Sequence, residues 1–406
     1  MNRDTLAAFY RDTLLEDVVP FWLRHAPDVE HGGIFTCLDR EGRCIDTDKS
    51  IWFQGRAAWM FATLYNTVEP RPEWLDLARN CIAFLRRYGA APDGKLYFTV
   101  TRDGRPLRMR RYVYSESFAA IANAALARAT GDPQAAADAL RFFARYLHHS
   151  FTTGVMPPKT DPVTRPMQGL GPHMIGIVTA QELRENLADP VVAGKTCTQW
   201  IDHGIAAIQR DFLKPDLEVV LETVGPHGEV IDHTEGRLLN PGHALEAAWF
   251  ILREARHRAN PGLLQTGLNL LDWMWRRGWD AEHGGLFYYR DLDDHPSAEY
   301  WHDMKFWWPH NEAVLATLLA YRLTGEPRYA QWHQTVHDWS FSHFPDPRYG
   351  EWYGYLHRDG TVSSTLKGTI WKGPFHLPRM LWYAWRLCAE PEAQPVLPRP
   401  ATHDKP

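Results

Sequence analysis

The chain has 406 residues, of which 45% are hydrophobic and 13% aromatic. This length and composition exclude a disordered chain or a minimal scaffold, and they suffice for one large core or two ordinary ones. The formal net charge is −5 and there is no basic run, so we expect no binding to nucleic acid or to an anionic membrane. A small neutral or weakly acidic ligand fits this composition better.

The first 26 residues are typical of an ordinary amphipathic helix. They contain no apolar stretch resembling a signal sequence or a membrane span, so we expect a cytoplasmic protein. The cysteines are odd in number and show neither CxxC spacing nor Cys/His ligand pairs, which predicts reduced, structural thiols. They are Cys37, Cys44, Cys81, Cys197 and Cys388.

One unit recurs six times along the chain, and the third copy is degraded. It consists of a short β-like run, an acidic or glycine turn, a second run, and a polar or aromatic segment that leads into a very apolar helix. The copies span residues 32–65, 94–127, 154–183, 218–252, 284–321 and 349–385. Between them lie one-sided amphipathic stretches, for example 74–88, 140–147 and 200–212.

The helices inside the copies are apolar nearly all round, which indicates burial on most sides, whereas those between the copies have one apolar face. Six buried helices that alternate with six amphipathic ones predict an all-α fold, the (α/α)6 barrel, with short β-hairpins at one end. We expect a single catalytic domain over residues 1–393. The Pro-rich segment 394–406 is predicted to be a disordered tail.

Each copy places a polar residue at the start of its apolar helix. A lone residue of this kind is most often a solvated cap, but ionisable residues at the same phase of all six copies favour convergence on one pocket. The alignment gives intervals that range, by subtraction, from 57 to 70 residues. The aligned residues are Arg56, Glu116, His173, His243, His310 and His376.

Four histidines and an arginine around one mouth predict proton transfer near neutral pH, because the unperturbed pKa of imidazole lies there. The sequence has no HExxH or similar ligand spacing, no GxGxxG after a strand and no GxxxxGKS/T motif. We therefore expect no metal and no cofactor.

Two local spacings refine this prediction. Glu246 follows His243 by three residues, so its carboxylate can lie on the same helix face and fix the tautomer of the imidazole. His310 and Glu312 are two residues apart and point in different directions, so we expect one of them to face the ligand squarely. Lys305 and Trp308 belong to a polar and aromatic edge, MKFWWPHNE, that suits a sugar.

Several segments together resemble the N-acylglucosamine 2-epimerase family, whose vertebrate members are also called renin-binding proteins. The resemblance runs from GGIF to FHLPR, over nearly the whole chain. The most diagnostic segments are WFQGRAAWM, TRDGRPL, LNPGHALEAAWF, WDAEHGGLFYY, KFWWPHNEA, DPRYGEWYGYL and KGPFHLPR.

The resemblance implies an (α/α)6 barrel, commonly a homodimer, that needs no cofactor. It also implies removal of the C2 proton of an opened sugar and reprotonation on the other face. Matched by motif, His243 and His376 are the acid–base pair, and Arg56 holds the C1 carbonyl oxygen. Glu246 and Glu312 match family acids that orient a histidine or assist ring opening. As substrate-binding residues we expect His173, Glu116, Trp308, His310, Lys305 and Trp371.

Three alternatives stay open. His173 is typical of branches acting on unmodified sugars, so a 2-epimerase or aldose–ketose isomerase of mannose, glucose or fructose is one. A glycoside hydrolase or lyase could use a carboxylate pair drawn from Glu116, Glu246 and Glu312. A non-enzymatic partner-binding role would need no histidine pair.

Overall fold

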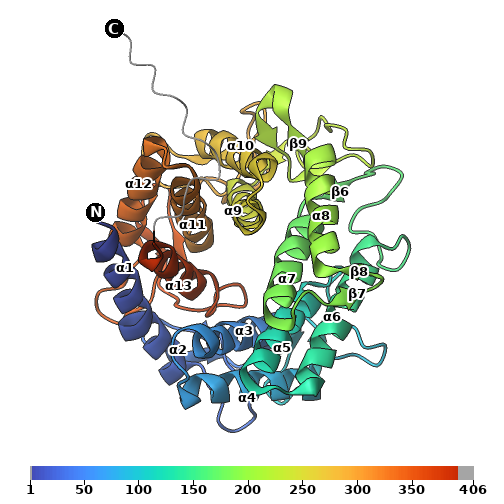
Figure 1. Ribbon diagram of the computed structural model, residues 1–406, viewed down its shortest axis with the longest axis vertical. Helices are drawn as coiled ribbons and strands as arrows, with labels where there is room; N and C mark the ends of the chain where they lie inside the picture. The colour runs from blue at the N-terminus through green and yellow to red at the C-terminus, as the bar shows by residue number, and fades with distance from the viewer. Residues whose placement is uncertain (1, 392–406) are drawn as a thin grey trace.

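Inner and outer helices form two concentric rings in the computed structural model, which describes residues 2–391 (Figure 1). Each inner helix forms the last part of one copy of the sequence repeat. The predicted all-α (α/α)6 barrel is confirmed, whereas the predicted tail 394–406 lies outside the described residues. The inner helices are α3 (Ile51–Thr67), α5 (Tyr114–Thr130), α7 (Gly171–Leu187), α9 (Pro241–Arg258), α11 (Trp307–Thr324) and α13 (His376–Ala389).

The outer ring begins at the N-terminus. Helix α1 (Arg3–Asp12) continues through a π-helical turn, η1 (Thr13–Val18), into α2 (Val19–His25), and α1 packs against α13 so that the ring closes. The other outer helices are α4 (Pro72–Tyr88), α6 (Pro133–Phe151), α8 (Cys197–Ala207) with the π-helical η2 (Ile208–Phe212), α10 (Pro261–Gly278) and α12 (Pro327–His343).

Capping residues mark the ends of several inner helices. Ser50 accepts a hydrogen bond from the backbone N–H of Phe53 at the start of α3, and Asn240 accepts one from His243 at the start of α9. Gly131 and Gly325 end α5 and α11 in the left-handed conformation, which glycine adopts without steric cost. These caps place the first turn of each inner helix, where the ligand-facing residues lie.

Short antiparallel strands decorate the end of the barrel at which the inner helices begin. The turns with the sequences REG, RDG and HRDG each connect the two strands of a β-hairpin, as predicted. The paired strands at this end are β1 (Cys37–Leu38) with β2 (Cys44–Asp46); β3 (Lys49–Ser50), β4 (Thr99–Val100) and β5 (Pro106–Arg108); β6 (Gln168–Gly169) with β11 (Thr223–Val224); β12 (Leu238–Leu239) with β13 (Arg290–Asp291); and β14 (Lys305–Phe306), β15 (Tyr355–Leu356) and β16 (Val362–Ser364).

Two further strand pairs do not lead directly into an inner helix. The pair β7 (Val191–Val192) and β8 (Lys195–Thr196) connects the end of α7 to α8 and so departs from the predicted single cluster of hairpins. The pair β9 (Leu213–Lys214) and β10 (Val219–Val220), joined through the 3-10 turn η3 (Pro215–Leu217), follows η2. Because most sheets join strands of successive repeats, they tie neighbouring loops of the barrel together.

A buried Asp–Lys ion pair recurs in three of these loops. In each set the aspartate also pairs with an arginine from the hairpin turn of the next repeat, which links the fifth repeat to the sixth, the sixth to the first and the first to the second. The sets are Asp28, Lys49 and Arg102; Asp280, Lys305 and Arg358; and Asp346, Lys367 and Arg40. These pairs close the ring where the two ends of the chain meet.

Two global features follow from the described residues. Over residues 2–391, no helix combines the length and apolar character needed to cross a membrane. All the cysteines are free, and all but Cys44 are buried, as expected of structural thiols.

Candidate active site

A cavity of about 910 Å³ opens at the end of the barrel where the inner helices begin. The positive ends of several helix dipoles therefore face it, which favours negative charge in the cavity. It is large enough for a sugar and lined mainly by aromatic and ionisable side chains. The predicted site residues that line it are Arg56, His243, Glu246, Trp308, Trp371 and His376.

His243 is held by a carboxylate that the sequence did not indicate. Its Nδ1 lies 3.0 Å from both carboxylate oxygens of Glu222, the residue before β11. The predicted partner, Glu246, instead accepts a hydrogen bond from Arg379 at 2.7 Å. Because Glu222 occupies Nδ1, the nitrogen of His243 left for a ligand is Nε2.

His376 has the same arrangement with a different partner. Its Nδ1 lies 2.6 Å from Oε1 of Glu312, which comes from the neighbouring inner helix α11. Glu312 also accepts hydrogen bonds from Trp249 and Arg379 and is fully buried beneath the cavity. Among the described residues, neither His243 nor His376 has a hydrogen-bond partner at Nε2.

The surroundings move the two pKa values in opposite directions. Burial acts to lower the pKa of His243, but the nearby carboxylates, Glu222 foremost, more than offset it, so its pKa is raised above the ordinary value. Burial, together with the positive charges of Arg56 and Arg379, lowers the pKa of His376 well below its ordinary value. The surroundings therefore favour the protonated form of His243 and the neutral form of His376.

A guanidinium occupies the centre of the acidic cluster. Ligand atoms of Glu246, Glu312 and His376 lie close enough together to hold a metal ion. However, Nη2 of Arg379 lies 2.7 Å from Glu246 and 2.6 Å from Glu312, so a buried cation of the protein already pairs with both carboxylates. This donor set fits an internal ion-pair network better than a metal.

Arg56 is a cation of the cavity without a salt-bridge partner among the described residues. Its guanidinium lies 4.2 Å from the ring centre of Phe118, 4.3 Å from that of Phe375 and 4.7 Å from that of Trp52. Within residues 2–391 it has no carboxylate or hydrogen-bond partner, and Nε is buried and unpartnered. A cation held by aromatic rings and lacking a counter-ion suits an oxygen that becomes negative during a reaction.

Aromatic side chains form the walls. The ring of Trp308 lies 5.1 Å from that of His243 and 5.8 Å from that of His376, so one indole contacts both imidazoles. Trp371 and Trp301 line the outer part of the cavity. Such surfaces suit the apolar faces of a sugar ring.

Three of the six aligned residues do not line the cavity, and two of them, His310 and Glu116, bond the preceding loop instead. Nε2 of His310 accepts the backbone N–H of Leu286, and its ring stacks on Trp339 of the outer helix α12. Oε1 of Glu116 accepts the backbone N–H of Leu96 in the same way. Both side chains anchor the loop that precedes their helix, rather than pointing to the axis as the alignment suggested.

Gln54 explains this error in the alignment. It accepts the backbone N–H of Ile34, so it is the counterpart of Glu116 and His310, and Arg56 comes two residues later. Two residues along an α-helix correspond to a rotation of about 200°, which turns the side chain to the opposite side. Thus Arg56 and Glu312 face the centre, whereas Gln54 and His310 face outward.

His173 and Lys305 also lie away from the cavity. The ring of His173 packs against Phe151 and Phe212, and the neighbouring residues Pro172 and Met174 line the cavity in its place. Lys305 is fully buried and forms an ion pair with Asp280 at 2.9 Å. The geometry therefore does not bring these two expected substrate-binding residues to the ligand.

Glu222 and Arg379 are functional residues that were not predicted from the sequence. Arg379 follows His376 by three residues on α13, and this spacing could have placed it on the same helix face. Glu222 left no comparable signal, because it reaches His243 from a loop 21 residues earlier in the chain.

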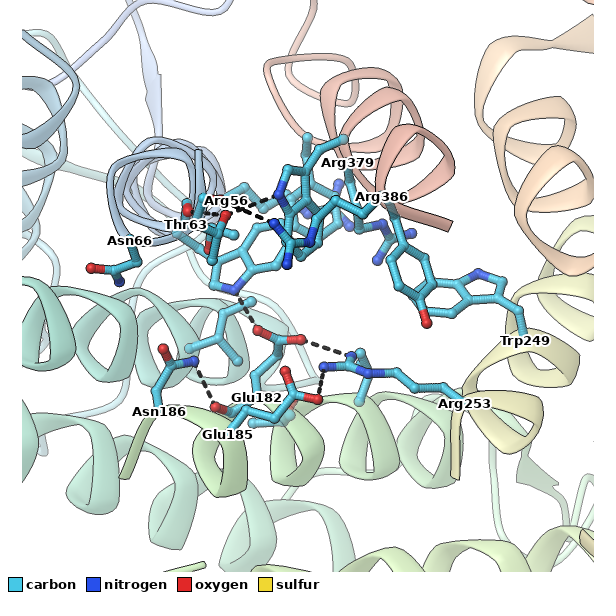
Figure 2. A pocket seen from close by; sticks show the side chains of 18 of the residues that line it. Arg56, Thr63, Asn66, Glu182, Glu185, Asn186, Trp249, Arg253, Arg379 and Arg386 are labelled. Atoms are coloured by element: carbon cyan, nitrogen blue, oxygen red, sulfur yellow. Dashed lines mark hydrogen bonds and ion pairs between the residues drawn. The ribbon is translucent and has the colours of Figure 1, made fainter. Parts of the chain in front are cut away.

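A second cavity, of about 360 Å³, is lined by residues toward the C-terminal ends of the inner helices, among them Asn186, Arg253 and Arg386 (Figure 2). Arg56 and Glu246 line both cavities, so the two cavities lie next to each other. In the second cavity, Arg253 forms ion pairs with Glu182 and Glu185 that join α9 to α7. The two histidines line only the first cavity, so the chemistry is assigned there.

Comparison with known proteins identifies the family of this chain. A profile described as N-acylglucosamine 2-epimerase (GlcNAc 2-epimerase) matches residues 33–376. The N-acylglucosamine 2-epimerase of Homo sapiens is 38% identical over 394 residues, which cover 94% of this chain and 90% of that protein.

Solved structures give the same fold. Cellobiose 2-epimerase from Bacillus thermoamylovorans B4167 superposes with a TM-score of 0.82 at 20% identity, covering 94% of this chain and all of that one. A D-mannose isomerase superposes with a TM-score of 0.78 at 18% identity, covering 93% and 97%. At these identities the matches establish the fold alone.

Proposed function

The chain belongs to the N-acylglucosamine 2-epimerase family, and from this premise we propose that it interconverts N-acylglucosamine and N-acylmannosamine. The observation that carries the proposal is the pair of histidines on one cavity, His243 and His376. Each has a carboxylate at Nδ1 and a free Nε2, and their pKa values are shifted in opposite directions. One neutral and one protonated imidazole are what a proton exchange at carbon requires.

The reaction proceeds on the open-chain sugar. Nε2 of neutral His376 takes the C2 proton, the C–H electron pair forms a C1–C2 double bond, and the carbonyl oxygen becomes an enediolate oxygen. Nε2–H of protonated His243 then returns a proton to C2 from the opposite face, and the C1 carbonyl forms again. In the reverse direction the two histidines exchange roles.

Arg56 stabilises the negative charge of the enediolate. Its guanidinium lines the cavity without a counter-ion, so it can pair with the C1 oxygen as negative charge develops there. The N-termini of the inner helices add positive potential at the same end of the barrel. The two glutamates deeper in the site, Glu246 and Glu312, both pair with Arg379, which offsets part of their negative charge.

The position of His173 bears on the choice of sugar. Its presence in the sequence favoured an unmodified sugar, but its ring packs on Phe151 and Phe212 rather than lining the cavity. With that argument removed, the identity to N-acylglucosamine 2-epimerases favours the N-acylated substrate.

Proton NMR in D₂O tests the proposal directly. With N-acetylmannosamine and purified protein, and without added metal, we expect N-acetylglucosamine to form with deuterium at C2. Exchange with mannose alone, giving glucose or fructose, would assign the protein to unmodified sugars instead. Release of reducing ends from a glycoside without C2 exchange would make it a hydrolase.

We also propose that the protein works as a cytoplasmic homodimer. Five free cysteines fit a reducing compartment, and the homodimer follows from the family resemblance. Sedimentation equilibrium measures the oligomeric state, and a monomer at micromolar concentration would contradict that part.

A further inference from the structure

Glu222 contacts His243 through both of its carboxylate oxygens. Each oxygen lies 3.0 Å from Nδ1, the side chain is 22% exposed, and it lines the catalytic cavity. The indole of Trp308 packs on the same imidazole, with 5.1 Å between ring centres. The ring of His243 is therefore held by a carboxylate and by an aromatic surface.

The backbone of Glu222 is fixed as firmly as its side chain. Its carbonyl oxygen accepts the N–H of Leu170 at 2.9 Å, and the next residue, Thr223, pairs with Gly169 between β11 and β6. Leu170 directly precedes α7. The carboxylate is thus carried by a strand pair that joins the third and fourth repeats, and it does not depend on α9, which carries His243.

No other acid can take its place at Nδ1. The charged groups that face His243 are Glu222, Glu246, Glu312 and His376. Glu246 and Glu312 are both engaged by Arg379, at 2.7 and 2.6 Å. Among residues 2–391, Glu222 has no arginine or lysine within ion-pair distance. Lys159, which lines the same cavity, interacts with its charge from further away, and His243 is the direct partner of the carboxylate.

We propose that Glu222 is the positioning residue of His243, accepting Nδ1–H so that Nε2 faces C2 of the sugar. Its role parallels that of Glu312 toward His376, although the two carboxylates come from unrelated places, a strand end and an inner helix. The inference rests on the proposed function for its catalytic meaning, but the contact itself can be tested without turnover.

The first test is titration of the histidine rings by ¹H–¹⁵N NMR, with the His243 signals identified by their loss in His243→Asn. In the wild type, the ¹⁵N shifts above the pKa should report the Nδ1–H tautomer. Glu222→Gln should lower the pKa of His243 by about 1 to 2 units, because the partner's charge is removed. Glu222→Asp keeps the charge and should retain more of the raised pKa. An Nε2–H tautomer in the wild type, or an unchanged pKa in Glu222→Gln, would overturn the inference.

The second test is kinetic. Glu222→Gln should lower kcat about 10- to 100-fold with KM changed less than about 3-fold, and move the high-pH limb of kcat to lower pH. The matched control is Glu218→Gln, which removes an exposed ion pair with Arg276 in the same region and should leave both constants unchanged. An equal loss in the control, or a change in KM alone, would contradict a positioning role.

The two proposals fail in different ways. A wild-type protein that exchanges no sugar, yet shows the Glu222-dependent titration, would remove the proposed function and leave the positioning of His243. An active wild type whose His243 titrates identically in Glu222→Gln would do the opposite.

Discussion

Oε1 of Glu312 lies 2.6 Å from Nδ1 of His376. The same oxygen accepts a hydrogen bond from Arg379, so the carboxylate orients the imidazole while its charge is balanced by a guanidinium. An acid balanced in this way can fix the tautomer of His376 without making the ring cationic. Burial and the positive charges of Arg56 and Arg379 then lower the pKa of His376.

Replacing Glu312 by glutamine should therefore damage turnover more than binding. We expect kcat to fall about 10- to 100-fold, because the tautomer of His376 is no longer fixed and Arg379 loses a counter-ion. Steady-state kinetics with N-acetylmannosamine measure the effect. Glu326→Gln, an exposed change just beyond α11, is the control, and equal kcat values in the two variants would refute the role given to Glu312.

The pH profile of kcat/KM should be bell-shaped. His376 must be neutral, and its lowered pKa places the acid limb below pH 6.5; His243 must be protonated, and its raised pKa places the basic limb above pH 6.5. Initial rates between pH 4.5 and 9 locate both limbs. A profile that rises monotonically through this range would show that a single base limits the reaction.

Glu116 should affect stability rather than activity. Burial raises its pKa from the ordinary 4.5 to about 7, so the folded protein gains stability from the protonated form at low pH. That contribution is lost as the pH rises through 7. Glu116→Gln keeps the contact to Leu96 without a charge. Its free energy of unfolding, relative to that of the wild type, should therefore increase by about 2 kcal/mol when the pH is raised from 5 to 8. Urea unfolding at the two pH values measures this, and a large loss of kcat would instead return Glu116 to the substrate.

Lys305 is predicted to hold the ring together. Lys305→Met leaves Asp280 buried with one partner fewer, and the expected cost is about 3 kcal/mol of unfolding free energy with kcat nearly unchanged. Arg105→Met, which removes an exposed pair with Asp103, should cost less than about 0.5 kcal/mol. A raised KM at unchanged stability would restore Lys305 as a sugar ligand.

The barrel could be predicted because the sixfold repeat is visible in the sequence, as is the alternation of helices that are apolar nearly all round with helices that have one apolar face. The position of His243, His376 and Arg56 on one cavity could be predicted for the same reason. The predicted positions of Glu116 and His310 were wrong, because a polar residue at the start of a helix can either bond the preceding loop or face the barrel axis. Positions two residues apart on the helix have these different orientations.

The partners of the two histidines were harder to predict. The i, i+3 spacing favoured Glu246 for His243, but Arg379 draws Glu246 away and Glu222 takes the position from a distant loop. Such contacts depend on how repeats meet in space, which local spacing does not encode.

The most direct test of the central claim uses His243→Asn and His376→Asn in D₂O, each with N-acetylmannosamine and with N-acetylglucosamine in separate samples. If the two histidines serve opposite faces of C2, neither variant interconverts the sugars. Each should still exchange the C2 proton of one epimer, and the two variants should exchange different epimers. Exchange of the same epimer by both variants, or interconversion by either at near wild-type rate, would contradict the two-histidine account.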